Sequence, residues 1–304
     1  MAKSSPLVSI AMATYNGEKF ITEQLESLVN QTYKNIEIVI VDDCSTDNTV
    51  RIIKDFQKKY GSITLIEKDS NSGITKTFEH AIRNCKGEYI ALSDQDDVWL
   101  SNKIEILLDE LGSEDAIYSN SLLVDKNGIF LNTDFKSLMN LQSYYSGAPF
   151  LLANCVPGHT ILMKTEFAKT VFPFPDHLMF DRWISFCAAS NNGIKYVDKP
   201  LVKYRQHDDN VIGTGKSRNK GGKKTSKEKF EEKLNELKIF ERATIKSEET
   251  KLILTKMLQL FTRRWSIERS WFFFNNIDKI LVIKNKSGFR KILYCMKMFF
   301  KANY

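Results

Sequence analysis

Residues 90–100 read IALSDQDDVWL, an apolar run that ends in three carboxylates before a tryptophan and a leucine. Asp94, Asp96 and Asp97 fall within four positions at this point. In open α/β sheets, ligands bind just beyond the carboxyl ends of the strands. The stretch therefore predicts a buried strand that ends at an acidic, ligand-binding edge of a sheet.

The sequence before this stretch alternates between strand-like and helix-like patterns. Continuous apolar runs of strand length lie at 7–13, 36–41, 63–67 and 87–93. Between them, apolar residues recur at the spacing of one helical face over 18–30, after Asp47 and over 72–84. This alternation, with short connections, predicts a parallel sheet that helices cover on both faces.

The pattern changes after a helix predicted at 104–111. Residues 116–131 read as a strand followed by a hairpin turn at Asp125–Gly128. Two short helices are predicted at 164–171 and 181–190. We therefore expect an α/β domain over residues 1–213, with a Rossmann-like mixed sheet flanked by helices.

The rest of the chain differs in composition and charge. Residues 214–227 are rich in Gly, Ser and Lys and contain no apolar residue, which predicts a flexible basic linker. A helical C-terminal appendage is expected over 228–304, with helices at 228–247, 249–274 and 277–301. Residues 1–213 hold 21 Lys and Arg against 28 Asp and Glu, whereas residues 214–304 hold 23 against 9. The resulting charges of −7 and +14 indicate a basic appendage that meets an anionic surface.

Acidic residues also follow the second predicted strand. Asp42 and Asp43 end that run, so two acidic groups distant in sequence converge on one sheet edge. Like charges raise one another's pKa unless a cation or several donors neutralise them. A hard divalent cation, Mg or Mn, resolves this conflict and keeps positions open for the phosphate oxygens of a diphosphate leaving group. The alternative is that the carboxylates only cap the helix expected after Leu100.

The chain resembles the family 2 inverting glycosyltransferases, which have the A-type nucleotide-sugar-binding fold. The resemblance runs through VSIAMATYNGEKFITEQLESLVNQTYKNIEIVIVDDCSTDNT at 8–49 and NSGITKTFEHAIRNCKGEYIALSDQDDVW at 71–99, and continues to about residue 213. It implies a hexosyltransferase that takes its sugar from a nucleotide diphosphate-sugar donor. It also implies that Ala13, Tyr15 and Asp43 contact the nucleoside, with Asp43 at the base.

By the same resemblance, the acidic run at 94–97 is the D-x-D element of the family. Asp94 is expected to contact the donor, and either Asp96 or Asp97 to ligate the metal directly. The stretch YRQHDDNVIG at 204–213 supplies His207, and similar enzymes close the metal site from a loop at the end of the domain. From residue type alone, a lone histidine is more often structural or at the surface.

The stretch HLMFDRWIS at 177–185 places Asp181 at the start of a predicted helix. Enzymes of this family carry their base in a similar acidic motif. The resemblance therefore implies that Asp181 deprotonates the acceptor hydroxyl as it attacks the anomeric carbon. The alternative is an ordinary aspartate at a helix N-cap.

Short motifs narrow the resemblance to bacterial rhamnosyltransferases of surface polysaccharide synthesis. They are ALSDQDDVW, NCVPGHT at 154–160 and YRQHDDNVIG. They imply L-rhamnose from dTDP-rhamnose as the donor and place His159 in the sugar or acceptor pocket, with a UDP-sugar as the alternative donor. The chain has neither the Q-x-x-R-W motif of processive synthases nor an apolar run long enough to span a membrane, so we expect transfer of a single sugar.

Two C-terminal stretches interleave aromatic with basic residues, namely FTRRWSIERSWFFF at 261–274 and GFRKILYCMKMFFK at 288–301. Helices of this kind lie in a membrane interface, with their cations against anionic head groups. This predicts a cytoplasmic enzyme, peripherally associated with the inner face of the cell membrane, that acts on a saccharide or lipid-linked saccharide acceptor. The alternative is a helical region whose aromatic side chains pack on one another or on the catalytic domain. No nucleic acid partner is expected, because no nucleic-acid-binding signature accompanies these residues.

Two other functions were weighed against the same residues. A nucleotidyltransferase usually carries a Gly-rich, basic phosphate-binding segment after the first strand, where this chain has TYNGEKF at 14–20. A non-catalytic nucleotide-binding or scaffold protein is the second alternative. The residues do not call for it, because every carboxylate expected of the enzyme is present.

Five dispersed cysteines without a C-x-x-C pair indicate a reducing compartment. The sequence leaves open whether the protein forms an oligomer.

Overall fold

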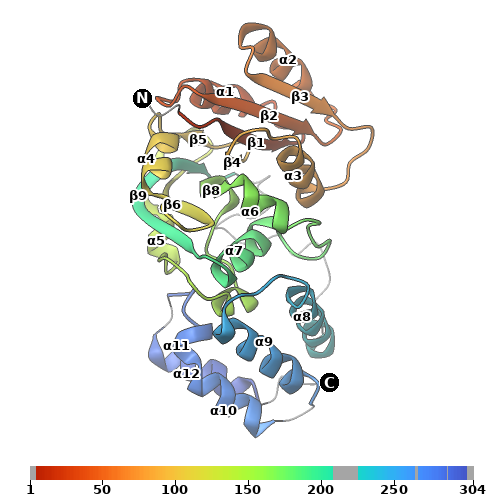
Figure 1. The fold of residues 1–304 in the computed structure, drawn as a ribbon, viewed down its shortest axis with the longest axis vertical. Helices are drawn as coiled ribbons and strands as arrows, with labels where there is room; N and C mark the ends of the chain where they lie inside the picture. The colour runs from red at the N-terminus through yellow and green to blue at the C-terminus, as the bar shows by residue number, and fades with distance from the viewer. Residues whose placement is uncertain (1–4, 208–224, 264–265, 286, 300–304) are drawn as a thin grey trace.

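The computed structural model describes residues 5–207, 225–263, 266–285 and 287–299. In that part of the chain, nine strands form one sheet in the order β3-β2-β1-β4-β8-β6-β9-β5, with β7 paired to β6 (Figure 1). The strands are β1 (Val8–Thr14), β2 (Ile36–Asp42), β3 (Ile63–Glu67), β4 (Tyr89–Ser93), β5 (Val98–Trp99), β6 (Ala116–Val124), β7 (Phe130–Asp134), β8 (Ile161–Lys164) and β9 (Ile194–Arg205).

Strands β1 to β4 build the parallel half that the alternating pattern predicts. β1 pairs in parallel with β2 and β4, and β2 pairs in parallel with β3. Along β1, Ile10 and Met12 belong to one apolar core whereas Ala11 belongs to the other. Because successive side chains of a strand point to opposite faces, both faces of this sheet are buried. This burial explains why its strands read as continuous apolar runs.

Helices cover both faces of the sheet. One core takes side chains from α1 (Ile21–Val29), α2 (Thr49–Lys59) and α4 (Lys103–Glu110). The other takes them from α3 (Ile74–Arg83), α6 (Thr165–Thr170) and α7 (Phe180–Ser190). Each of these helices lies where the sequence predicts one, within a few residues at either end. A short α5 (Phe135–Leu138) and two 3₁₀ helices, η1 (Ala148–Leu151) and η2 (Gly158–Thr160), complete this half.

The second half of the sheet contains the predicted antiparallel structure. β4 pairs with β8, and β8 with β6, in antiparallel fashion, whereas β6 and β9 run parallel. The predicted hairpin joins β6 to β7, and its turn closes where the Gly128 N–H donates to the Asp125 carbonyl (3.0 Å). β8 and β9 were not predicted as strands. In β9 the apolar pattern is interrupted by charged residues and by Pro200, opposite which the register with β6 shifts.

The C-terminal region is more broken than the sequence predicts. Beyond residue 224 the described residues form α8 (Ser226–Phe240), α9 (Glu248–Phe261), α10 (Ile267–Asn275), α11 (Ile277–Ile280) and α12 (Gly288–Lys297). The single helices predicted at 249–274 and 277–301 are therefore wrong, because each is two helices. A new helix starts at α10, where the Ser266 hydroxyl accepts the Arg269 N–H (2.9 Å). After α11 the chain leaves helical geometry, because Lys284 forms an antiparallel bridge with Met139.

Most of the linker predicted at 214–227 lies outside the described residues. Its last residues belong to α8, which begins with a capping box. The Thr225 hydroxyl accepts the Glu228 N–H (3.2 Å), and the Glu228 carboxylate accepts the Thr225 N–H (2.7 Å). In the ranges that the structure describes, no helix is both long and apolar enough to cross a membrane.

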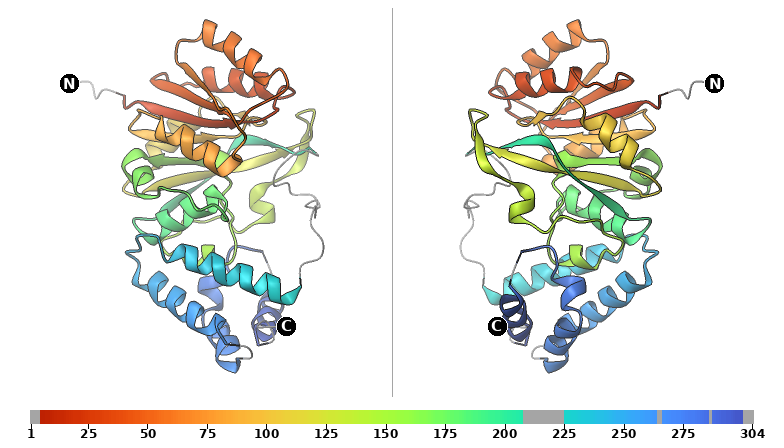
Figure 2. Two further views of the ribbon diagram at one scale, coloured as in Figure 1. Left: turned by 90° about the vertical axis from the view of Figure 1, so that its right-hand side faces the viewer. Right: turned by 90° about the vertical axis from the view of Figure 1, so that its left-hand side faces the viewer.

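The C-terminal helices pack on the α/β domain that precedes them, called the catalytic half below. The rings of Phe186 on α7 and Phe240 on α8 lie 4.3 Å apart within one core. On α9, the Thr250 hydroxyl accepts the Gly147 N–H (2.8 Å). Two further views show α8 to α12 together at the end of the molecule away from β1 to β3 (Figure 2). Part of the basic region therefore packs on the catalytic half, as one of the two alternatives predicted.

Candidate active site

The carboxyl ends of β1, β2 and β4 meet at one edge of the sheet. In the strand register, Thr14 lies beside Asp42, and Met12 lies beside Ser93. Beyond these pairs, the Tyr15 N–H donates to the Gln95 side-chain oxygen (2.9 Å), and the Gln95 amide donates back to the Tyr15 carbonyl (3.0 Å). The loop after β1 and the acidic run after β4 are thus held together, as their positions at strand ends predict.

The predicted nucleoside contacts lie at this edge. Ala13 is half-buried in β1 beside Val41, and the Tyr15 side chain is exposed. Asp43 is buried, and its N–H donates to the Thr14 carbonyl (2.8 Å), which ties the end of β2 to the end of β1. The three predicted residues therefore lie within a short span of two neighbouring strands.

The Asp43 carboxylate is held by several donors. It accepts the N–H groups of Ser72 and Gly73, each at 2.9 Å, and the Lys68 ammonium. Burial favours the neutral acid, but the hydrogen bonds and the charge of Lys68 prevail and lower the pKa of Asp43. Gly73 has a φ of +84°, a backbone conformation in which glycine is not strained. Asp43 is thus an oriented, ionised carboxylate at the rim of the sheet.

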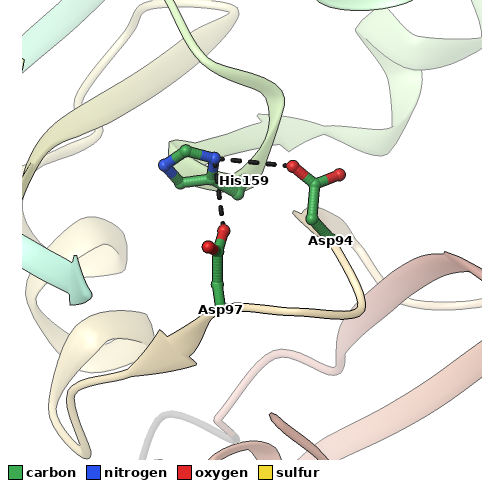
Figure 3. A group of neighbouring side chains, drawn as sticks. All are labelled: Asp94, Asp97 and His159. Carbon is green, nitrogen blue, oxygen red and sulfur yellow. Dashed lines mark ion pairs between the residues drawn. The ribbon is translucent and has the colours of Figure 1, made fainter. Parts of the chain in front are cut away.

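The acidic run splits into two groups, the first of which contains Asp94, Asp97 and His159 (Figure 3). The His159 Nδ1 lies 3.3 Å from Asp97 Oδ2 and 3.5 Å from Asp94 Oδ2, and its Nε2 lies 3.0 Å from the Ser121 hydroxyl. Figure 3 shows both carboxylates facing the same ring nitrogen. His159 is 1% exposed, and both of its nitrogens face protein groups. His159 is thus buried against the two carboxylates, and its place in a sugar or acceptor pocket stays a prediction.

Burial and charge shift the pKa values of this group in opposite senses. Burial raises the pKa of Asp97 to about 7. The charge of His159 acts in the opposite direction, and the negative charges of Asp96 and Asp94 raise the pKa further. Burial alone would lower the pKa of His159, but the charges of Asp97 and Asp94 prevail and raise it. The histidine and its two carboxylates are mutually dependent charges in a site with little water.

The second group joins Asp96 to His207. The His207 Nε2 lies 2.8 Å from Asp96 Oδ2, and the imidazole ring packs on Phe20 with ring centres 4.7 Å apart. Arg205, at the end of β9, donates from Nε to the Asp96 carbonyl (2.8 Å) and from its backbone N–H to Asp97 Oδ1 (3.0 Å). The end of β9 therefore aligns His207 with the acidic run.

Both groups offer donor atoms that suit a divalent cation. The Asp97 Oδ2 is buried without a hydrogen-bond partner among the described residues, and it faces His159. The side chains of Asp96 and His207 are 14% and 10% exposed. In the first group, Asp97 and His159 are 0% and 2% exposed, but Asp94 is 29% exposed. A cation that also binds a diphosphate needs open coordination positions. The Asp96–His207 pair is partly open at both side chains, whereas the deeper group of Asp94, Asp97 and His159 is open only at Asp94.

Asp181 lies at the start of α7, in the first turn but not at the N-cap, which is Met179. The alternative of an N-cap aspartate therefore does not describe it. Burial raises its pKa to about 7, with a further contribution from the charge of Asp94, against the Arg182 N–H that it accepts (2.6 Å). Gly158 approaches this turn so closely that a Cβ there would lie 3.7 Å from the Asp181 Cβ. The turn that presents Asp181 thus lies against the segment that carries His159.

Several supporting residues were not identified from the sequence. Lys103 is fully buried, donates to the His159 carbonyl (2.6 Å) and lies over the Trp99 ring at 3.2 Å. Nothing in the pattern of α4 distinguishes it from a surface lysine. Arg205 could have been found, because it lies two residues before His207 in the stretch YRQHDDNVIG that supplied the metal ligand.

A mixed sheet with carboxylates gathered at the carboxyl ends of its strands is the arrangement expected of an enzyme with the A-type nucleotide-sugar-binding fold. The family model described as Glycosyl transferase family 2 matches residues 9–172. The chain belongs to this family and is a glycosyltransferase that uses a nucleotide-sugar.

Relatives and a solved structure agree with this assignment. The chain is 34% identical over 217 residues to dTDP-rhamnosyl transferase RfbG of Shigella flexneri, a match that spans 66% of this chain and 73% of the relative. It is 32% identical over 207 residues to UDP-Glc:alpha-D-GlcNAc-diphosphoundecaprenol beta-1,3-glucosyltransferase WfaP of Escherichia coli, spanning 67% and 79%. The mannosyltransferase PcManGT of Pyrobaculum calidifontis, in complex with GDP-Man and Mn²⁺, superimposes with a TM-score of 0.55 at 16% identity, over 97% of this chain and 80% of that one. The A-type fold expected from the sequence is thereby confirmed.

Proposed function

We propose that this glycosyltransferase moves one L-rhamnose from dTDP-rhamnose to a saccharide acceptor, with inversion at the anomeric carbon. The observation that carries the mechanism is Asp181, whose burial at the start of α7 raises its pKa to about 7. The donor is supported by the relative named as a dTDP-rhamnosyl transferase, which is 34% identical to this chain.

We assign the nucleoside to the ends of β1 and β2. Ala13 and the exposed Tyr15 ring offer a surface for the nucleoside, and the ionised Asp43 offers an acceptor for N–H groups of the base. Asp94, at the end of β4, is assigned to the donor. Its side chain is 29% exposed, more than that of Asp96 or Asp97.

We assign the metal to Asp96 and His207, because both of these side chains are partly exposed whereas Asp97 and His159 are buried. Mg or Mn held there supplies positive charge that stabilises the diphosphate as it leaves. Asp97, the other ligand predicted, faces His159 instead and accepts the Arg205 N–H (3.0 Å). Its role in this proposal is to fix the acidic run against β9.

Asp181 acts as the base. It takes the proton of an acceptor hydroxyl as the hydroxyl oxygen bonds to the anomeric carbon, while the bond from that carbon to the diphosphate oxygen breaks. A base whose pKa lies near the working pH is ionised in about half of the molecules and accepts a proton readily. One displacement of this kind gives a product with the opposite anomeric configuration.

We infer that the acceptor is linked to a lipid and that the enzyme works from the cytoplasmic side, at the inner face of the cell membrane. The E. coli relative is named for a diphosphoundecaprenol-linked sugar. The charge of +14 over residues 214–304 favours the approach to an anionic membrane surface.

The same relative supports a second candidate, a UDP-sugar donor, because its name gives UDP-Glc as the substrate. The two donors are distinguished by nucleotide release from dTDP-rhamnose and from UDP-glucose, with Mn²⁺ and the diphosphoundecaprenol-linked GlcNAc as acceptor. We expect release from dTDP-rhamnose to be at least about tenfold faster. Faster release from UDP-glucose would leave the glycosyltransferase assignment in place and would rule out dTDP-rhamnose as the preferred donor. Tight nucleotide binding without turnover of either donor would favour a non-catalytic nucleotide-binding protein.

A further inference from the structure

Helix α10 leaves one apolar face exposed. Ile267, Trp271 and Phe274 follow one another at the spacing i, i+4, i+7, which places them on one side of a helix. They are 76%, 64% and 46% exposed, and the Trp271 and Phe274 rings stack with their centres 6.0 Å apart. An aromatic stripe of this kind is unusual on a surface that meets only water.

Helix α12 repeats this arrangement. Its exposed apolar side chains follow the spacing i, i+3, i+4, i+7 and are 69%, 40%, 38% and 61% exposed; they are Phe289, Ile292, Leu293 and Met296. Cys295, which lies off this stripe, is 1% exposed and is the residue by which α12 itself is buried.

The two helices are joined through their inner sides. The Phe273 and Tyr294 rings lie 6.1 Å apart, and the buried Arg269 donates from Nε to the Met298 carbonyl (2.6 Å). Both helices lie at the end of the molecule opposite the parallel strands (Figure 1). The exposed side chains therefore form the outer surface of a packed pair of helices and do not belong to its core.

Two exposed cations, Arg290 and Lys297, flank the apolar stripe of α12, and the half-buried Lys291 lies on the side of Cys295. The helix has no acidic residue between Gly288 and Lys297. Among the described residues these three cations form no ion pair. Lys279, on α11, and Lys284, between α11 and α12, are also exposed, although Lys279 pairs with Glu249. Exposed apolar side chains flanked by cations complement a surface whose interior is apolar and whose outer boundary carries negative charge.

We propose that α10 and α12 form a docking face for an anionic lipid surface, an inference that rests on the lipid-linked acceptor of the proposed function. The apolar side chains enter the acyl boundary, and the cations contact the head groups. A second copy of the chain is disfavoured as occupant. In a symmetric pair the same patch forms both sides of the interface, so each patch would bring the cations of α12 to a surface of the same positive sign.

The test is sedimentation of the full chain with vesicles of phosphatidylcholine alone and of phosphatidylcholine mixed with phosphatidylglycerol. We expect binding to the anionic vesicles, weakened by salt, and at least about tenfold weaker binding for Trp271→Ala/Phe289→Ala. Leu252→Ala, which removes an apolar side chain 72% exposed on α9, is the matched control and should bind as the wild type does. Unchanged binding by the double variant would overturn the proposal. So would a dimer of the wild type that the double variant dissociates.

A second measurement separates this inference from the proposed function. The double variant should bind dTDP with Mn²⁺ as tightly as the wild type, because neither changed residue lies at the sheet edge. Vesicle binding without turnover of dTDP-rhamnose would remove the proposed donor and leave the docking face. Turnover without vesicle binding by the wild type would remove the docking face and leave the donor.

Discussion

The two ends of this molecule present different kinds of side chain at their surfaces. At the edge of the sheet, apolar residues are enclosed, and the charges of Asp94, Asp96 and Asp97 gather at strand ends. In the C-terminal helices, a guanidinium is enclosed while Trp271 and other apolar side chains are exposed. The first arrangement suits a small, charged ligand that must be oriented, and the second suits a broad surface. Binding of the donor and location in the cell are therefore assigned to different regions.

This contrast predicts that chemistry depends on the residues around the active site and not on the exposed apolar side chains of α10 and α12. Replacing Asp181→Asn removes the base while keeping the size of the side chain, and it should lower kcat on the order of 10³-fold. Binding of dTDP should stay within about twofold, as calorimetric titration would measure. Asp176→Asn, an exposed aspartate paired with Lys76, is the control and should keep full activity. Full activity in Asp181→Asn would remove the assigned base.

The raised pKa of Asp181 predicts the pH dependence of the rate. A base works in its ionised form, so kcat/KM should rise about tenfold per pH unit below the pKa. It should level off above pH 7 or so, where the carboxylate is ionised. A profile of initial rates from pH 5 to 9 would measure this. A rate that is already constant from pH 5 would mean that Asp181 is not the titrating base.

The division of the acidic run into two groups gives a sharper prediction. His207→Ala should weaken the binding of dTDP in the presence of Mn²⁺ by at least about tenfold and leave binding in EDTA unchanged. His80→Ala, on α3 and away from the acidic run, is the matched control. An equal loss with and without Mn²⁺ would show that His207 does not hold the metal and would favour the deeper group with His159.

One contact joins the two regions and predicts the smallest effect. Arg182, next to the assigned base, pairs with Glu236 on α8 (3.0 Å) and also donates to the Phe150 and Leu151 carbonyls. Glu236→Gln should lower kcat by about threefold and stability by about 2 kcal/mol, because it leaves a largely buried guanidinium without its ion-pair partner. Glu241→Gln, exposed just beyond α8, serves as the control. An unchanged kcat together with a lowered stability would restrict this contact to a structural role.

The sequence predicted most of the fold because both faces of the parallel strands are buried, which leaves long apolar runs. β9 escaped prediction because it carries Pro200 and charged residues. The sequence also placed Asp43 and the acidic run correctly at the edge of the sheet. Each follows directly after a predicted strand, and the alternation of strands and helices puts the carboxyl ends of these strands at one edge. The positions of the strand ends could not predict that Asp96 and Asp97, which are adjacent in sequence, face different histidines. That separation depends on how the ends of β9 and η2 approach the loop, which is a long-range property.

The breaks in the C-terminal helices could not be predicted from the sequence either, because they too depend on contacts with distant parts of the chain. The chain between α11 and α12 follows Met139 of the catalytic half, a partner distant in sequence. Helical periodicity continues through 277–301 regardless, because it reports only which residues are apolar. The exposed stripes of α10 and α12 have the same periodicity as buried ones.

The central claim is that the edge of the sheet binds a nucleotide diphosphate with the help of a divalent cation. Its most direct test is calorimetric titration of the full chain with dTDP and with UDP, each with Mn²⁺ and again with EDTA. The account predicts binding that requires Mn²⁺, favours dTDP and is lost in Asp96→Ala. Binding of neither nucleotide under any of these conditions, or equal binding in EDTA, would contradict it.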